Sequence, residues 1–265
     1  MLIAERRRRI LEHVRQHGHA SFRDLADVVG SSESTVRRDL RSMVAEGLLA
    51  GTRGGVSHLD AVSAARGGIG TGTDAGGTTV ADPVAVERAA IANLAAGLVE
   101  PGSAVLLGPG RSTFEVARCL AGVGPLTVVT NSVPVTMALL GAEQIDLVMV
   151  GGTLRRSIRA FVGPLTEQSL QGLRGAQVFI SGEGVTLDRG LTTPNVFAAA
   201  TDMALVAAAS RVIVLADHTK LGHETMCQTV PTERIDVLVT DAKADPAIVR
   251  SLVAAGVDVQ IADHN

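Results

Sequence analysis

Seven short aliphatic runs in the C-terminal part of the chain constrain its fold more than any other feature. Each run is almost continuously apolar, as strands buried on both faces of a parallel sheet are, and helical patterns separate several of them. The alternation predicts an α/β domain with a mostly parallel sheet over residues 83–265. Because 46% of the residues are hydrophobic and only 2% aromatic, the core must be aliphatic. The runs are SAVLL, LTVVT, IDLVMV, AQVFI, RVIVLA, IDVLVT and VDVQI.

The segment before residue 60 follows a helical period instead. ERRRRILEHVRQHG predicts a helix that buries Ile10, Leu11 and Val14 and ends at Gly18. SFRDLADVV predicts a second helix, which buries Phe22, Leu25, Ala26 and Val29. A turn at Gly30 and Ser31 then leads to Ser32, a candidate N-cap for a third helix. Leu48 and Val56 flank a Gly54, Gly55 reversal that predicts a β-hairpin, so the unit is expected to be a winged helix-turn-helix, mainly α with a small hairpin.

The third helix, around residues 33–43, has one apolar face and one arginine face. Val36, Leu40, Met43 and Val44 recur at helical spacing and predict the buried side. Ser34, Thr35, Arg37, Arg38 and Arg41 point elsewhere. In a helix-turn-helix the second helix of the motif enters the major groove, so these five side chains are the candidate DNA contacts, together with Arg53, Gly54 and Gly55 of the hairpin. The alternative is a solvated helix whose charges face water. Asp39 is expected to orient a neighbouring arginine.

Charge is placed unevenly along the chain. Residues 1–60 carry ten arginines and eight acidic residues, which gives this segment a net charge of +2. The whole chain has a net charge of −3. Because phosphate attraction is local, the N-terminal segment is the expected contact with a polyanion. Residues 60–82 are dense in Gly and Thr and poor in large apolar residues, which predicts a flexible linker between a domain at 1–59 and one at 83–265. Pro83 is expected at the first position of the helix that follows.

These residues resemble the DeoR family of bacterial repressors over nearly the whole chain. The N-terminal match rests on ERRRRIL, FRDLADVVGSSESTVRRDL and GLLAGTRGGV. The chain departs from the family where members usually carry Arg at the position of Ala50 and His at that of Arg53. The resemblance implies a transcriptional regulator that binds double-stranded operator DNA.

Polar and glycine residues follow several of the predicted strands. LLGPGRSTFEVARCL reads as a strand, a Gly-rich turn and a helix whose start could bind an anion. Other strand ends finish in TNS, GG, SGEG and ADHTK, and in an open parallel sheet such ends meet at one edge. Lys220 is one of only two lysines and follows a strand, which favours contact with a phosphorylated ligand. The alternatives are ordinary turns for the glycines and a solvated position for Lys220.

The second domain also resembles the DeoR effector domain, whose fold is similar to ribose-5-phosphate isomerase and whose usual ligands are phosphorylated sugars. Gly108 stands where members often have an acidic residue. Arg155, Arg156 and Arg159 are further candidates for a phosphate contact. The positions that match the family's effector site are Gly110, Ser112, Thr113, Thr130, Asn131, Gly151, Gly152, Gly182, Gly184, Asp217 and Lys220.

The sequence therefore predicts a homo-oligomeric regulator, a dimer or tetramer, that represses a carbohydrate-metabolism operon until a phosphorylated sugar or related metabolite binds. No catalytic residue, metal site or cofactor is expected. Neither of two candidate metal-ligand sets has a recognised spacing, and Cys119 and Cys227 are too few for a disulfide framework and lack the paired spacing of a zinc site. The candidate sets are His13, His17 and His19, and His218, His223 and Cys227. With no signal peptide and no membrane-length apolar run, a cytoplasmic location is expected. Two alternatives stay open: a sugar-phosphate isomerase-like enzyme with a DNA-binding appendage, and a nucleotide-binding module.

Overall fold

The computed structural model describes residues 3–17, 19–45, 50–52, 55–57 and 82–263. The chain divides into two compact units, Met1–Asp82 and Pro83–Asn265. Gly18, Leu48, Arg53, Gly54 and the predicted linker lie outside the described residues, apart from Asp82. Within the described part, no helix combines the length and apolar character needed to span a bilayer.

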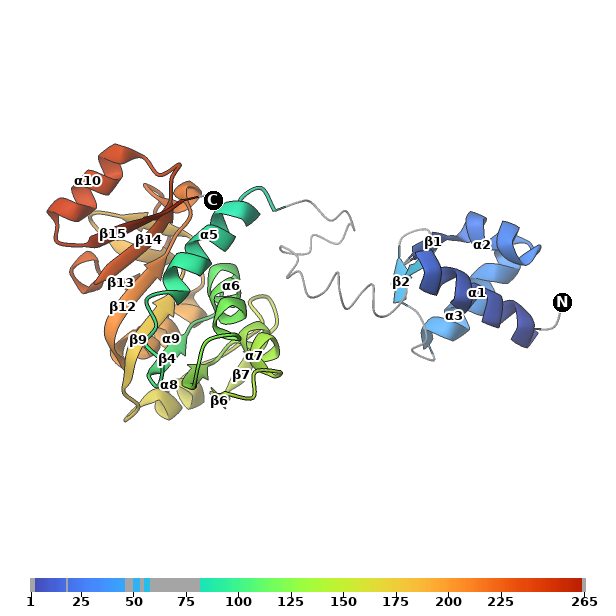
Figure 1. The fold of residues 1–265 in the computed structure, drawn as a ribbon, viewed down its shortest axis with the longest axis horizontal. Coiled ribbons are helices and arrows are strands. Elements are labelled where there is room, and N and C mark those ends of the chain that lie inside the picture. The colour runs from blue at the N-terminus through green and yellow to red at the C-terminus, as the bar shows by residue number, and fades with distance from the viewer. Residues whose placement is uncertain (1–2, 18, 46–49, 53–54, 58–81, 264–265) are drawn as a thin grey trace. The chain divides into compact units, whose positions relative to one another are not determined.

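The N-terminal unit is a three-helix bundle with a small antiparallel sheet (Figure 1). Its helices are α1 (Ile3–His17), α2 (Phe22–Val29) and α3 (Glu33–Ala45). Its strands, β1 (His19–Ser21), β2 (Ala50–Thr52) and β3 (Gly55–Ser57), pair in the order β1-β3-β2. The predicted hairpin is confirmed as β2 and β3, while β1 was not predicted. The core contains Ile10, Val14, Leu25, Val29, Val36, Leu40, Met43 and Val56.

Two caps fix the ends of α2. At its start, the Ser21 hydroxyl accepts a hydrogen bond from the Asp24 amide, and the Asp24 carboxylate accepts one from the Ser21 amide. At its end, Gly30 adopts a left-handed conformation with φ of 60°, and the Ser31 amide reaches back to the Ala26 carbonyl at 3.1 Å. The tight turn into α3 follows from this conformation.

The C-terminal unit is a seven-stranded parallel sheet with the order β15-β14-β12-β9-β4-β5-β6. All seven predicted aliphatic runs form these strands. Their bounds are β4 (Ala104–Leu107), β5 (Leu126–Thr130), β6 (Ile145–Met149), β9 (Gly175–Ile180), β12 (Ala209–Leu215), β14 (Val237–Asp241) and β15 (Asp258–Ala262).

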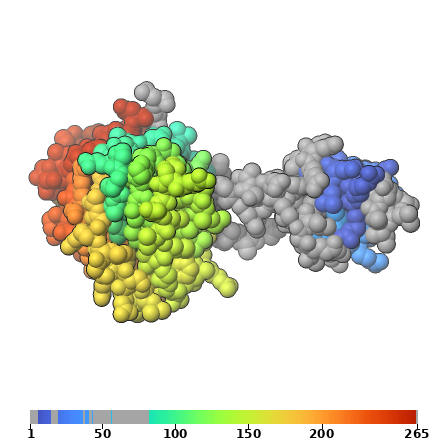
Figure 2. Space-filling model, turned by 60° about the horizontal axis from the view of Figure 1, so that its bottom comes forward, coloured from blue at the N-terminus to red at the C-terminus, as the bar shows by residue number. Residues whose placement is uncertain are grey.

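Helices cover both faces of the sheet. Alternate residues of each strand point to opposite faces, and both sets are apolar, so each face needs a layer of helices to bury it. Val105, Leu107 and Phe179 belong to one core, which includes residues of α5, α6 and α7. Leu106 and Val178 belong to the other, which includes residues of α9 and α10. In Figure 2 the green and yellow segments of this unit lie against its orange and red segments in one body. The helices are α5 (Ala85–Ala96), α6 (Arg111–Leu120), α7 (Val133–Leu139), α8 (Pro164–Leu170), α9 (Val196–Ala207) and α10 (Pro246–Ala254).

Several details differ from the sequence-based expectation. Val84 is the N-cap of α5, so Pro83 precedes the cap and does not occupy the first helical position. Two small antiparallel sheets were not predicted, because their strands have only three or four residues and are rich in Gly, Thr and polar side chains. They pair β7 (Thr153–Arg155) with β8 (Ala160–Val162), and β10 (Gly184–Thr186) with β11 (Gly190–Thr193) and β13 (Cys227–Val230). Two short 3-10 turns, η1 (His218–Lys220) and η2 (Thr232–Arg234), complete the unit.

Candidate functional site

The helix α3 presents a polar start and a buried apolar side. The Ser32 hydroxyl accepts a hydrogen bond from the Thr35 amide at 3.3 Å, as an N-cap does, and it also bonds the hydroxyls of Ser34 and Thr35. Val36 and Leu40 are buried, whereas Ser34 and Arg38 are exposed and Thr35 is partly exposed. Ser34, Thr35 and Arg38 are therefore open to solvent, and a DNA contact by these three residues stays a prediction.

Asp39 makes an ion pair inside the N-terminal unit. Its carboxylate accepts a hydrogen bond from Nε of Arg6 in α1 at 2.5 Å, and each side chain is 11% exposed. The expectation that Asp39 orients an arginine is confirmed, but the arginine comes from α1 and not from α3. The pair stabilises the placement of α3 against α1.

For the other predicted DNA contacts, the structure describes the backbone at most. Arg37 and Arg41 lie in α3, but their side chains are outside the described part, as are Arg53 and Gly54. Gly55 begins β3. A DNA contact by these residues stays a prediction.

The order in which the chain adds strands to the C-terminal sheet reverses between the neighbouring strands β4 and β9. From β4 the chain continues to β5 on one side, and from β9 it continues to β12 on the other. Ligands of open α/β sheets bind outside the carboxyl ends of strands at such a switch. The residues there form what we call the switch-point cluster: Gly110, Ser112, Ser181, Asp217 and Lys220.

The loop after β4 brings Gly110 close to Ser181, which follows β9. Gly110 has φ of 148°, and a Cβ atom added to it would lie 3.6 Å from Cβ of Ser181. Thr113 donates its hydroxyl hydrogen to the Gly110 carbonyl at 3.0 Å, which fixes the start of α6. The Ser112 hydroxyl in the same turn is buried and has no hydrogen-bond partner. This hydroxyl lies in the first turn of α6, where the partial positive charge of a helix start favours an anion.

Lys220 reaches the cluster from η1, which follows β12. Its Nζ donates a hydrogen bond to Oγ of Ser181 at 3.1 Å. Asp217 caps η1 by accepting a hydrogen bond from the Thr219 amide at 3.2 Å. Burial lowers the pKa of Lys220, the carboxylates of Asp217 and Glu183 oppose that shift, and the guanidiniums of Arg88 and Arg111 add to it. The charges of two distant segments, at Arg88 and Arg111, therefore act on Lys220.

Arg88 lies on the buried side of α5 and pairs with Asp217. Its Nη2 is 3.6 Å from Oδ2 of Asp217, and the side chains are 4% and 1% exposed. The structure thus places Asp217 in an ion pair and a cap, and both interactions position Lys220.

Two further carboxylates of this unit, Asp202 and Glu183, influence each other electrostatically. Asp202 of α9 is 5% exposed, and its Oδ1 has no hydrogen-bond partner. Burial raises the pKa of Asp202 well above its usual value, and the charge of Glu183 raises it further. Asp202 was missed in the sequence, although it is the only charged residue of α9.

Thr130 and Asn131 follow β5 and are buried. The Thr130 hydroxyl donates to the Leu107 carbonyl at 2.6 Å, which ties the ends of β5 and β4 together. The Asn131 amide nitrogen donates to the Phe161 carbonyl at 2.8 Å, and its Oδ1 is left without a partner. Asn131 is therefore available as an acceptor.

Three of the remaining predicted glycines have packing roles, whereas a Cβ atom on the fourth, Gly151, would meet nothing within 4 Å. A Cβ atom on Gly152 would lie 2.0 Å from Oγ1 of Thr166, which donates to the Gly151 carbonyl. Added Cβ atoms on Gly182 and Gly184 would lie 2.6 Å and 2.3 Å from backbone carbonyl oxygens. These close approaches explain Gly152, Gly182 and Gly184 without a ligand.

The three predicted arginines that follow β6 have different surroundings. Arg155 stacks on the ring of Phe197 in α9, with Cζ 4.1 Å from the ring centroid. Arg159 has a left-handed backbone with φ of 50°, and its carbonyl accepts a hydrogen bond from the Val133 amide. Arg156 is exposed. A phosphate contact by these three residues stays a prediction.

Comparison with known proteins adds two family matches. Residues 6–62 match the DeoR-like helix-turn-helix domain, and residues 84–242 match the DeoR C terminal sensor domain. A putative aga operon transcriptional repressor of Escherichia coli is 32% identical over 97% of this chain and 93% of its own. The HTH-type transcriptional regulator GlpR of Haloferax volcanii is 34% identical over 98% of both chains. Among solved structures, ribose 5-phosphate isomerase A of Methanocaldococcus jannaschii is similar in part. The superposition covers 51% of this chain and 53% of the isomerase, with 18% sequence identity and a TM-score of 0.39.

Proposed function

The chain belongs to the DeoR family of transcriptional regulators, and from this membership we propose that it represses a carbohydrate-metabolism operon. In this proposal, α3 binds operator DNA, and a phosphorylated sugar or related metabolite binds the switch-point cluster and releases the repressor. The coarser role, a helix-turn-helix regulator with a sensor domain, follows from the family itself. The DNA contacts and the effector are the proposed parts.

DNA binding is supported by the first turn of α3. Exposed Ser34 and Arg38 can reach base edges or phosphates, while Val36 and Leu40 anchor the opposite side in the core. Helix-turn-helix proteins usually read two half-sites related by two-fold symmetry, so we infer a homo-oligomer. The relatives carry names of transcriptional regulators and repressors.

The observation that carries the effector proposal is the contact of Lys220 with Ser181 beside the start of α6. A phosphate bound there would accept hydrogen bonds from the Ser112 hydroxyl, which has no partner among the described residues, and from backbone amides at the start of α6. The Lys220 ammonium would supply a charge-assisted hydrogen bond. Asn131 and Asp202 have buried oxygens without partners, which suit the hydroxyl groups of a sugar.

The enzyme alternative is not favoured, because the relatives are transcriptional regulators. The nucleotide alternative is best separated by ligand binding. Thermal denaturation and calorimetry with pentose phosphates, hexose phosphates, the unphosphorylated sugars and nucleotides would test the effector class. We expect stabilisation by a sugar phosphate and none by the matching free sugar. Stabilisation by nucleotides alone would contradict the proposal.

The two lysines of the chain provide a matched pair of variants. Lys220→Met should weaken binding of the sugar phosphate about 10- to 100-fold, the value of one hydrogen bond to a charged group. Lys243→Met removes the same charge from a side chain that bonds Glu87, outside the switch-point cluster, and should bind as the wild type does. Equal affinities of wild type and Lys220→Met would remove Lys220 from the site.

A further inference from the structure

The outer face of α9 is mostly apolar, and the guanidinium of Arg155 lies over the Phe197 ring at its N-terminal end. Val196, Phe197 and Met203 are 56%, 59% and 54% exposed, and Ala200 and Ala207 are exposed as well. The only charged residue of the helix, Asp202, lies on its buried side. A helix that is apolar all round is normally covered on every side. The rest of the outer face, from Ala200 to Ala207, is therefore a candidate surface for a partner.

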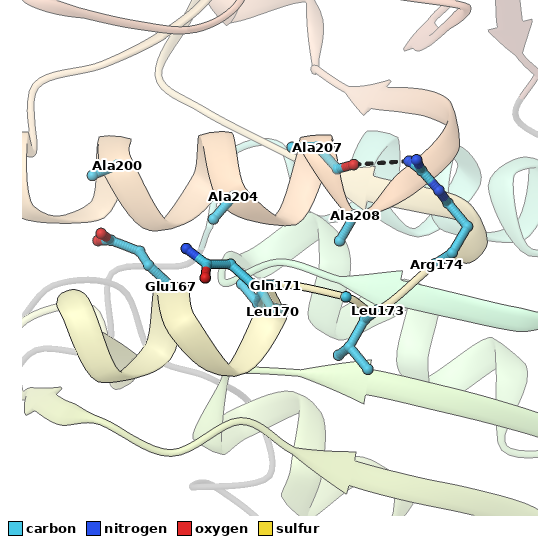
Figure 3. A pocket seen from close by; sticks show the side chains of 10 residues that line it. Glu167, Leu170, Gln171, Leu173, Arg174, Ala200, Ala204, Ala207 and Ala208 are labelled. Carbon is cyan, nitrogen blue, oxygen red and sulfur yellow. Dashed lines mark hydrogen bonds between the residues drawn. The ribbon is translucent and has the colours of Figure 1, made fainter.

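A groove runs along this face between α8 and α9 (Figure 3). It has a volume of about 600 Å³. Its α9 wall consists of alanines, whose small side chains let a second helix approach at the short end of the usual 8–10 Å range. The alanines are Ala200, Ala204, Ala207 and Ala208.

Two opposite charges stand at the two ends of the groove. In Figure 3 Glu167 lies near Ala200, while Arg174 lies at the other end and donates a hydrogen bond to the Ala207 carbonyl at 3.0 Å. Neither side chain makes an ion pair with any residue that the structure describes. Ala200 and Ala207 are seven residues apart, so the two charges are separated by about 10 Å along α9.

This arrangement is complementary to itself. A two-fold axis perpendicular to α9 near Ala204 would place Glu167 of each copy opposite Arg174 of the other, and would pack the two apolar faces together. In an isologous interface the same surface of each subunit contacts its counterpart, so the surface must be complementary to its own rotated copy. We propose that the α8–α9 face is the interface between two copies of this chain, with the two α9 helices antiparallel. The proposal holds independently of which ligand binds the switch-point cluster.

The first test is the oligomeric state of the full chain, measured by sedimentation velocity at tens of micromolar. Met203→Glu should lower the mass of the wild-type assembly by half or more. Met137→Glu introduces the same change in α7 at a side chain that is 64% exposed, and should leave the mass unchanged. A monomeric wild type, or a Met203→Glu protein with the wild-type mass, would overturn the proposal.

The second test is specific for a second copy and does not depend on the Met203 variant. Glu167→Arg and Arg174→Glu should each weaken self-association, because each places like charges opposite one another twice per dimer. The double variant Glu167→Arg/Arg174→Glu restores both pairs with their signs exchanged, so its dissociation constant should return toward the wild-type value. A double variant that associates no better than the single ones would contradict the two-fold arrangement. Circular dichroism of all four proteins controls for folding.

Discussion

The guanidinium of Arg88 in α5 lies 3.6 Å from the carboxylate of Asp217, and both side chains are almost fully buried. The pair links the first helix of the C-terminal unit to the loop that holds Lys220. Because Asp217 also caps η1, the same carboxylate sets the conformation of that loop. The switch-point cluster thus depends on a residue far from it in the sequence.

Removing one partner of this ion pair should be costly. Arg88→Met leaves the Asp217 carboxylate buried without its guanidinium, and we expect a loss of about 3 kcal/mol in the free energy of unfolding. The double variant Arg88→Met/Asp217→Asn should lose less than the sum of the single changes, since it leaves no unpaired charge. Urea denaturation of the wild type, Arg88→Met, Asp217→Asn and the double variant measures these losses. Strictly additive losses would show that the pair is not coupled.

Lys220 predicts a pH dependence of effector binding. Its pKa is lowered from the ordinary 10.5, mainly by burial, so it loses its proton at a lower pH than an exposed lysine does. Affinity for a sugar phosphate should therefore fall as the pH rises through this lowered pKa. Lys220→Arg should bind phosphate with no such fall, because arginine keeps its charge. Calorimetric titrations at increasing alkaline pH would show this fall in affinity for the wild type. Parallel pH profiles of wild type and Lys220→Arg would contradict the role of Lys220 in phosphate binding.

Adjacent glycines after β6 should respond differently to alanine. Gly152 has φ of 152°, and an added Cβ would lie 2.0 Å from Oγ1 of Thr166. Gly152→Ala should destabilise the C-terminal unit by about 1–3 kcal/mol. Gly151→Ala meets nothing within 4 Å and should change stability by less than about 0.5 kcal/mol. Melting temperatures of both variants test this contrast, and equal values would refute the packing role of Gly152.

Asp202 predicts that stability falls as the pH rises. Its folded-state pKa is raised well above 3.8, so the folded state binds the proton more tightly than the unfolded state does. The stabilisation from that proton is complete below pH 3.8 and is lost as the pH rises through the folded-state pKa. Asp202→Asn removes the titration, so its melting temperature should exceed that of the wild type at neutral pH and the difference should shrink on acidification. A constant difference across this range would contradict the raised pKa.

The sequence predicted the parallel sheet because buried strands are continuous apolar runs, as in AQVFI and RVIVLA. It did not predict β10, β11 and β13, because strands of three or four residues with Gly and Thr have no period to detect. The α2–α3 motif was predictable from Gly30 and Ser32, whose conformational and capping preferences are local.

The candidate site was only partly visible in the sequence. Gly110, Ser112 and Lys220 follow strands, so the rule for strand ends found them. Arg88 and Asp202 come from the buried sides of helices, where a sequence pattern shows a charge but not its partner. Asp202 is the only charged residue of α9, and that isolation is the signal that could have singled it out.

The most direct test of the account is the binding of duplex DNA by wild type and Arg38→Ala, followed by fluorescence anisotropy as a function of salt. The probe is a labelled duplex from the region upstream of the chain's own gene. Wild type should bind with an affinity that falls linearly with the logarithm of salt concentration, and Arg38→Ala should bind at least about 5-fold more weakly. Arg118→Ala removes an equal charge from an exposed position in α6 and should bind as the wild type does. Equal affinities of wild type and Arg38→Ala, or no retention of duplex at low salt, would contradict the proposed role of α3.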